Sequence, residues 1–200
     1  MIEHLKNSIL LADKFKSKLT PEILGLDGMC LVKMRHLLNN VVNMPGAKYL
    51  EVGVYKGATF VAALYKNKYD RAIAIDNWSE NGDYRKEFLL KCDRHIGKYN
   101  LIFDDCFNVK IDGKINIYFY DGNHTKESHA KALSHFYDSL DDEIIFLVDD
   151  YNWAQVRCGT NMAVMDWDIL YDVWLGHCSY HHDPTPWGAG IYAAVLKKRI

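Results

Sequence analysis

The chain has 200 residues, a length that favours one domain, 1–200, with a substantial buried core. Its formal net charge of −2 provides no broad basic surface, which argues against nucleic acid as a partner. The five cysteines are dispersed, without a Cys-x-x-Cys pair, and we see neither a signal peptide nor an apolar run long enough to span a membrane, so we expect a cytoplasmic protein.

The first 44 residues are expected to form a helical cap, 1–44, that precedes an α/β core, 45–200. Apolar residues recur at helical spacing over 3–17 and 29–42, and Pro21 sits where a short helix would begin. Such helices either cap a sheet or cover a ligand, and the capping role is the interpretation we favour.

From residue 48 onward, short apolar runs alternate with helical patterns. The pattern predicts strands over 48–52, 71–75, 99–103, 115–120, 143–148 and 189–196. It predicts helices over 58–65, 83–95, 125–140 and 158–175, and a hairpin strand over 178–182. Alternation of this kind indicates a mostly parallel sheet with helices on both faces, and the terminal strand pair indicates one antiparallel strand.

The loop after the first strand has the form Glu51-x-Gly53-x-x-x-Gly57. Gly53 can adopt a positive φ, and both glycines let the backbone approach a ligand closely. The spacing differs from Gly-x-Gly-x-x-Gly, which holds a pyrophosphate. A ligand with a carboxylate and a ribose but no phosphate fits this loop better.

Acidic residues follow four of the predicted strands. They are Asp76, Asp104-Asp105, Asp121 and Asp149-Asp150. Ligands of open α/β sheets lie outside the carboxyl ends of the strands, although a single aspartate there is equally typical of a helix cap. Four such ends beside the glycine loop indicate a ligand site.

These segments, together with Asp121-Gly-Asn-His124 and Asp149-Asp150-Tyr151, resemble the class I S-adenosylmethionine (SAM)-dependent methyltransferases. The resemblance covers roughly residues 28–197 and is nearest to a small branch with an Asp-Gly-x-His segment and an Asp-Asp pair. It implies a Rossmann-like methyltransferase fold, whose seven-stranded sheet has an antiparallel last strand.

The resemblance implies a set of SAM-binding residues. These are Glu51, Gly53, Gly57, Asp76, Asn77, Trp78, Asp105, Cys106 and Asp121. Asp76 would accept hydrogen bonds from the ribose hydroxyls, Glu51 would orient the ammonium group, and Asp105 would receive the adenine amino group. Trp78 is explained equally well by ordinary packing.

His124 and Asp149 are the candidate catalytic residues, because methyl transfer to oxygen requires positioning and a group that takes a proton. His124 is also compatible with a helix-capping role. In related metal-using O-methyltransferases the places of Asp121, Asp149 and Asp150 hold a divalent ion, and oxygen ligands suit Mg²⁺ or another divalent cation. Cofactor binding and helix capping by single acids are the alternative. Tyr151, Trp153 and Trp187 are candidates for an acceptor pocket over the sheet edge, and aromatic packing in the core or in a lid explains them as well.

The sequence therefore favours SAM-dependent methyl transfer to a small-molecule acceptor at oxygen, with no nucleic-acid or membrane partner. Homo-oligomerisation stays open. The alternatives are a non-catalytic SAM-binding protein, an NAD-dependent dehydrogenase or epimerase on a similar sheet, and a metal-dependent hydroxylase. The glycine loop argues against the nicotinamide cofactor.

Overall fold

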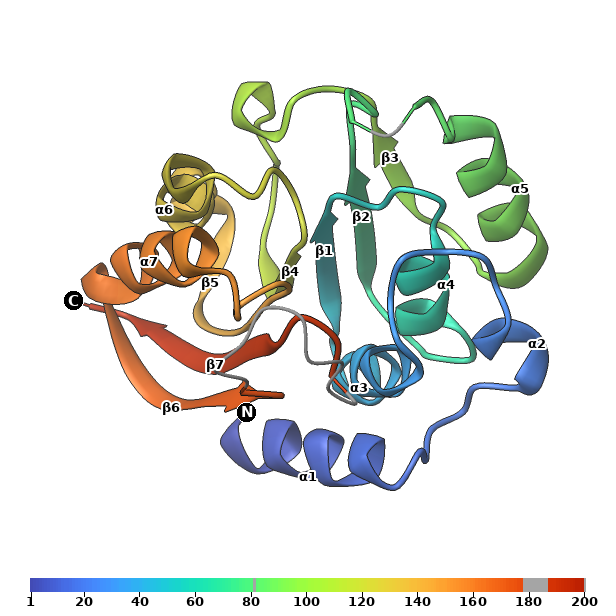
Figure 1. Cartoon of the computed structure of the whole chain (residues 1–200), viewed down its shortest axis with the longest axis horizontal. Coiled ribbons are helices and arrows are strands. Elements are labelled where there is room, and N and C mark those ends of the chain that lie inside the picture. The colour runs from blue at the N-terminus through green and yellow to red at the C-terminus, as the bar shows by residue number, and fades with distance from the viewer. Residues whose placement is uncertain (81, 178–186, 200) are drawn as a thin grey trace.

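The structure, a computed structural model, describes residues 1–80, 82–177 and 187–199. These residues form a sheet flanked by helices on both faces (Figure 1). The helices are α1 (Ile2–Asp13), α2 (Pro21–Leu24), α3 (Val32–Val42), α4 (Ala58–Leu64), α5 (Arg85–His95), α6 (Lys126–His135) and α7 (Ala154–Ala163). The strands are β1 (Lys48–Val52), β2 (Arg71–Ile75), β3 (Asn100–Ile102), β4 (Ile115–Tyr120), β5 (Leu140–Val148), β6 (Trp167–Leu175) and β7 (Ile191–Lys198). Three short 3₁₀ turns are η1 (Cys106–Asn108), η2 (Tyr137–Ser139) and η3 (Val164–Asp166).

The seven strands lie in the order β3-β2-β1-β4-β5-β7-β6. β1 to β5 pair in parallel, and β7 lies between β5 and β6, antiparallel to both. The predicted seven-stranded sheet with an antiparallel last strand is confirmed. Because the parallel strands point the same way, their carboxyl ends meet along one edge, which places the acids there together.

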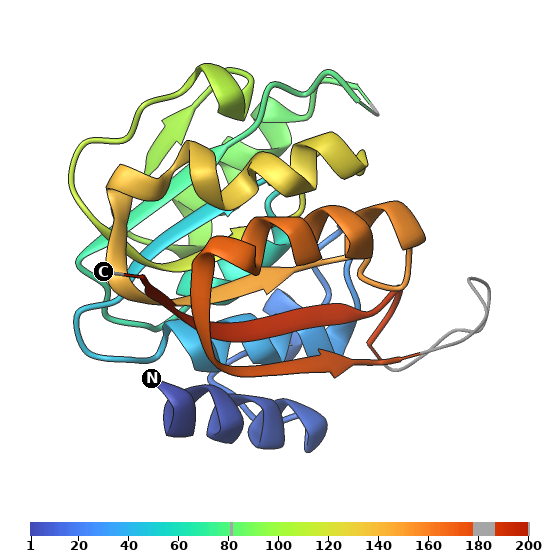
Figure 2. The ribbon, with the colours of Figure 1, turned by 90° about the vertical axis from the view of Figure 1, so that its left-hand side faces the viewer.

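Helices cover both faces of the sheet (Figure 2), and a cluster of buried apolar side chains lies on each face. Side chains of α1, α3, α4 and α5 pack with residues such as Tyr49 and Phe119 from one face. Side chains of α6 and α7 pack with Leu50 and Tyr118 from the other face. The N-terminal helices therefore share a core with α4, the helix that follows the glycine loop.

Gly53 must be a glycine for a reason that concerns the backbone. Its φ is +85°, and a Cβ there would lie 1.9 Å from the carbonyl oxygen of Asp121. Its N–H donates to the carbonyl of Ile75. The loops after β1, β2 and β4 thus converge at Gly53, which fixes the edge of the sheet where the acids lie.

The prediction of a helix over 158–175 was wrong in its second half. α7 ends at Ala163 and β6 occupies Trp167–Leu175. β6 is rich in aromatic and β-branched residues, which favour strands. A register shift between Ile169 and Tyr171 interrupts the two-residue alternation, so the strand signal was obscured.

The strand that pairs with the outer edge of β7 also differs from the prediction. β7 pairs with β5 on one side and with β6 on the other, and the hairpin strand predicted over 178–182 lies outside the described residues. The helix predicted over 125–140 ends at His135, and η2 then leads into β5, which begins at Leu140 and not at residue 143. The remaining predicted elements of the core agree with the structure to within two residues at each end.

Candidate active site

A cavity of about 800 Å³ opens at the carboxyl ends of β1, β2, β4 and β5. It brings together most of the predicted site residues, namely Gly53, Asp76, Asn77, Trp78, Asp105, Cys106, Asp121, His124, Asp149 and Asp150. Glu51 and Gly57 are not among the residues that line it. Apolar residues that the prediction did not assign to the site, Met29, Leu31 and Met34, reach the cavity from the N-terminal cap.

The carboxylate of Asp76 is fixed by two backbone N–H groups. Oδ2 accepts from Tyr55 N–H at 2.8 Å, and Oδ1 accepts from Trp78 N–H at 2.7 Å. The indole N–H of Trp78 in turn donates to the carbonyl of Tyr55 at 2.8 Å. Tyr55 and Trp78 both have positive φ, +46° and +48°, an uncommon conformation for large side chains. These two strained turns hold the Asp76 carboxylate in one orientation at the carboxyl end of β2.

Glu51 lies behind the wall of the cavity, fully buried. Its carboxylate accepts from the hydroxyls of Tyr49 and Thr59, each at 2.5 Å. Burial raises its pKa to about 8. Because Thr59 belongs to α4, Glu51 ties β1 to the helix on the far side of the glycine loop.

Gly57 does not line the cavity either, and it acts on the position of the helix behind the glycine loop. It precedes α4 with φ +81°, and a Cβ there would lie 2.8 Å from the ring of Phe88. Its role in the structure is to start the helix close to α5.

Asp105 and Cys106 lie across the cavity from the glycine loop, after β3. Asp105 caps η1, its carboxylate accepting from Phe107 N–H at 2.9 Å. Burial raises the pKa of the Cys106 thiol, with a further contribution from the Asp105 charge. Cys106 is thus an apolar neighbour in this wall rather than a reactive thiolate.

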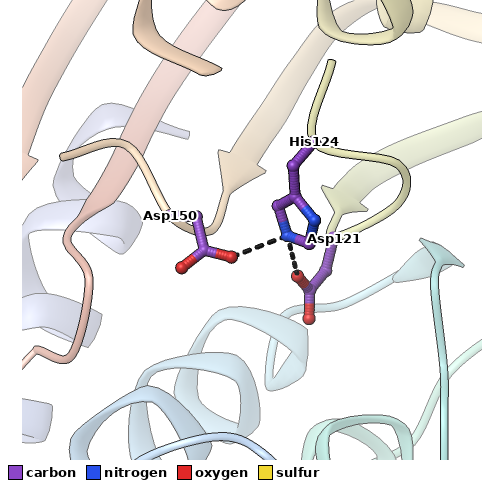
Figure 3. Close-up of side chains that lie close together, drawn as sticks. All are labelled: Asp121, His124 and Asp150. Carbon is purple, nitrogen blue, oxygen red and sulfur yellow. Dashed lines mark ion pairs between the residues drawn. The ribbon is translucent and has the colours of Figure 1, made fainter. Parts of the chain in front are cut away.

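His124, Asp121 and Asp150 converge beyond the carboxyl ends of β4 and β5 (Figure 3), where all three line the cavity. His124 Nε2 lies 2.7 Å from Asp150 Oδ2 and 3.9 Å from Asp121 Oδ1. The Asp150 carboxylate raises the pKa of His124. Burial, followed by the neighbouring carboxylates, raises the pKa of Asp121 and brings that of Asp149 to about 7. Burial and crowding therefore favour the protonated forms of these carboxyls, whereas the carboxylate of Asp150 favours the charged form of the imidazole.

The side of the cavity beyond this cluster is largely apolar. Trp153 packs over His124 with ring centroids 5.0 Å apart, and Trp187 lines the same side. Tyr151 does not line the cavity; it is buried against Trp174 and Tyr192. The expected aromatic wall is therefore made by two of the three candidates, with Met29, Leu31 and Met34 completing it.

The cap is held to the glycine loop by charged contacts. Lys56 pairs with Asp27 at 2.7 Å, and Lys91 donates to the carbonyls of Asp27 and Lys56 at 2.8 and 2.9 Å. These bonds place the segment that carries Met29 and Leu31 beside the cavity. The sequence did not single out this contribution, because the helical spacing predicted over 29–42 accounts for both residues; the helix in fact begins at Val32, which leaves them in the preceding segment.

The sheet order and the cavity at the carboxyl ends of its parallel strands are those of a methyltransferase, and comparison with known proteins supports this assignment. Residues 50–151 match the family model described as a methyltransferase domain, and the chain belongs to that family. Its fold is the class I, Rossmann-like fold of the SAM-dependent methyltransferases. No curated protein matches the sequence.

Solved structures share the fold at low sequence identity. A ribosomal protein L11 methylase from Lactobacillus delbrueckii subsp. bulgaricus is 16% identical, with a TM-score of 0.58 over 84% of this chain and 79% of that one. The SAH-bound methyltransferase PaMTH1 from Podospora anserina is 14% identical, with a TM-score of 0.58 over 99% and 88%. An rRNA methylase from Streptococcus thermophilus is 11% identical, with a TM-score of 0.58 over 87% and 100%. Another matched structure, a methyltransferase complexed with SAH, is longer, and this chain spans only 48% of its length.

No helix in the described ranges combines the length and the apolar character that crossing a membrane requires.

Proposed function

We propose that this methyltransferase transfers the methyl group of SAM to an oxygen atom of a small hydroxylated acceptor. The observation that carries the proposal is the continuity of the cavity. One space runs from Asp76 past Gly53 to His124, Asp149 and Asp150, and onward to the apolar wall of the cap. A cofactor and an acceptor can therefore meet at the cluster of acids.

Asp76 is proposed to bind the ribose hydroxyls of SAM. Each of its oxygens already accepts one backbone N–H, and each carboxylate oxygen can accept a second hydrogen bond. Asn77 and Trp78 line the adjoining wall, and Asp105 with Cys106 is proposed to border the adenine. The methionyl part of SAM then lies along the loop at Gly53. There the Asp121 carboxylate can accept a hydrogen bond from the ammonium group of SAM.

Glu51 and Gly57 support this site from behind. Since the Glu51 carboxylate is already bonded to Tyr49 and Thr59, we assign it a positioning role in place of direct contact with the ammonium group. Gly57 is proposed to act in the same way, by letting α4 begin close to the loop.

The reaction is an in-line displacement. The acceptor oxygen forms a bond to the methyl carbon while the carbon–sulfur bond breaks, and S-adenosylhomocysteine (SAH) leaves with the electron pair. The proton of the acceptor hydroxyl passes to a group at the cluster, for which His124 and Asp149 are the candidates. The acids also face the positive sulfonium, which favours binding of the charged cofactor.

A divalent metal fits this cluster. Asp121, Asp149 and Asp150 supply oxygen donors, and the imidazole of His124 lies beside them, with Nε2 2.7 Å from Asp150 Oδ2. When bound, such an ion lowers the pKa of an acceptor hydroxyl. The carboxylates would hold it in place, and Trp153 would keep the His124 ring beside it.

The acceptor is proposed to be small and not anionic. Seven carboxylates line the cavity, and none of its described lining residues is a lysine or arginine. Met29 is 71% exposed and Leu31 47% exposed, so the rim presents apolar surface next to the opening. An uncharged or cationic molecule with an apolar body suits these walls better than a polyanion does.

Calorimetric titration tests the cofactor assignment. The protein is titrated with SAH, NAD and ATP, and we expect micromolar binding of SAH alone. Asp76→Ala should weaken SAH binding by about a hundredfold, since it removes two charge-assisted hydrogen bonds of roughly 1.5 kcal/mol each.

Asp142→Ala, at an exposed aspartate outside the cavity, is the matched control and should bind SAH as the wild type does. Unchanged SAH affinity in Asp76→Ala would remove the ribose assignment, and tight NAD binding would count against the proposed function.

A further inference from the structure

We propose that Glu80 and Asn123 form a gate over the cofactor side of the cavity, and that this gate sets the rates at which SAM enters and SAH leaves. The proposal rests on the proposed function, since it takes the cofactor to lie along the glycine loop. It gives a role to two polar residues that line the cavity and that neither cofactor binding nor proton transfer uses.

The gate is one hydrogen bond between two loops. Asn123 Nδ2 donates to Glu80 Oε1 at 2.8 Å. Glu80 lies beyond the carboxyl end of β2, and Asn123 lies beyond the carboxyl end of β4, 43 residues later in the chain. Both residues line the cavity and both are exposed to solvent. The bond therefore joins two walls of the cavity where the cavity meets the surface.

The order of the strands places this bond across the glycine loop. β1 lies between β2 and β4 in the sheet, and the three strands are parallel. A bond between the loops that follow β2 and β4 therefore passes over the carboxyl end of β1, where Gly53 begins the glycine loop. Asp76 and Asp121 directly follow the same two strands. A cofactor that extends from Asp76 to Asp121 would lie beneath the Glu80–Asn123 bond.

Asn123 is the fixed half of the gate. Its Oδ1 accepts the N–H of Thr125 at 3.1 Å and the hydroxyl of Ser128 at 3.2 Å, at the start of α6. Because the amide oxygen is held by the helix start, the amide nitrogen is directed away from the helix and towards Glu80. The donor is thus already oriented for its partner across the cavity.

Glu80 is the movable half of the gate. Trp78, two residues earlier, is buried, and it is anchored by hydrogen bonds to Asp76 and to the carbonyl of Tyr55. Glu80 itself is exposed, and rotation of its long side chain breaks the bond to Asn123 while the anchored backbone stays in place. Opening therefore needs a side-chain rotation and no movement of the sheet or the helices.

A gate differs from a ligand contact in the rate constants that it changes. A gate that has to open for passage in either direction slows entry and exit alike. Its removal raises the association and dissociation rate constants together and leaves the dissociation constant nearly unchanged. Removal of a contact with the ligand instead raises the dissociation rate constant alone.

Surface plasmon resonance measures both rate constants, with the full-length protein immobilised and SAH as the analyte. We expect Glu80→Ala to raise the association and dissociation rate constants at least about fivefold each, the factor that corresponds to the loss of one hydrogen bond. The dissociation constant should change by less than about twofold, because the two effects cancel.

Exchange of donor and acceptor sharpens the test. Asn123→Asp keeps an oxygen for Thr125 and Ser128 but sets a carboxylate against Glu80, so both rate constants should rise as in Glu80→Ala. The double variant Glu80→Gln/Asn123→Asp has an amide at position 80 and a carboxylate at position 123. The bond is then restored in reverse, and both rate constants should return to within about twofold of the wild-type values. Glu127→Gln, on the first turn of α6, is the control and should keep the wild-type rates.

Wild-type rate constants in Glu80→Ala and Asn123→Asp would overturn the proposal. A rise in the dissociation rate constant alone would also overturn it, because it would make these residues ligand contacts. The two proposals fail in distinguishable ways. SAH binding with rates that these variants do not change refutes the gate alone, whereas no binding of SAH to the wild type refutes the proposed cofactor site and the gate with it.

Discussion

Glu51 shows how one buried side chain can hold a glycine loop in place without lining the cavity beside it. The glycine motif made it a candidate for direct contact, and the sequence could not show that Tyr49 and Thr59 would occupy its carboxylate. Two hydroxyls that come from β1 and α4 were not visible in a motif defined by glycine spacing. Asp76, by contrast, was correctly placed because the end of a predicted strand fixes where its side chain lies.

Glu51 should make stability depend on pH. Its folded pKa of about 8 exceeds its usual value of 4.5, so the folded protein retains a proton that the unfolded chain has lost. The contribution is complete below about pH 4.5 and disappears as pH rises towards 8. We expect Glu51→Gln to remove a fall of a few kcal/mol in the free energy of unfolding between pH 5 and pH 8.5.

Urea denaturation at several pH values measures this difference. Glu127→Gln, on the exposed first turn of α6, is the control and should leave the wild-type profile unchanged. Parallel profiles for the wild type and Glu51→Gln would show that burial does not shift this carboxyl.

At the scale of elements, α3 supports the helix that begins at the glycine loop. The buried amide of Asn39 donates to the carbonyls of Ala62 and Tyr65, at 2.7 and 3.0 Å, near the end of α4. Its oxygen accepts Lys18 N–H at 3.0 Å, which anchors the segment between α1 and α2. Carbonyls at a helix end have no partner within the helix, so Asn39 satisfies groups that burial would otherwise leave unpaired.

Asn39→Ala should lower the free energy of unfolding by about 2–4 kcal/mol, because it leaves buried polar groups without partners. Asn43→Ala is the matched control. Asn43 is exposed and accepts a bond from Lys18 Nζ, so its loss should cost less than about 0.5 kcal/mol. Equal costs for the two variants, measured by chemical denaturation, would contradict this account of how the cap is attached.

The helices and strands were predicted correctly where the sequence pattern fitted only one kind of element. β1, β2 and β4 are buried almost throughout and read as short, mostly apolar runs with clear ends. β6 lies at the edge of the sheet and contains a register shift, so its mixed pattern also fitted a helix. The acceptor side of the cavity was the least predictable part, because it depends on tertiary contacts between the cap, Trp153 and Trp187.

At the scale of the whole molecule, the distribution of charge argues against a nucleic-acid acceptor. Related folds include an rRNA methylase and a ribosomal protein methylase, so the fold alone does not choose the acceptor. Here the carboxylates gather at the cavity, and the chain as a whole carries a net charge of −2. A polyanion gains its affinity mainly from basic side chains that neutralise phosphates.

We therefore expect a labelled single-stranded RNA to bind weakly, with a dissociation constant above roughly 100 µM at 0.15 M salt. Fluorescence anisotropy measures this directly, with SAH present so that the cofactor side is filled. Micromolar binding that weakens steeply with added salt would favour a nucleic-acid acceptor instead.

The most direct test of the central claim is a crystal structure of the protein soaked with SAH. We predict that the ribose hydroxyls lie within hydrogen-bond distance of Asp76, with the adenine towards Asp105 and Cys106 and the sulfur facing the cluster of His124 and Asp150. A cavity that stays empty, or SAH bound with its ribose away from Asp76, would contradict the account.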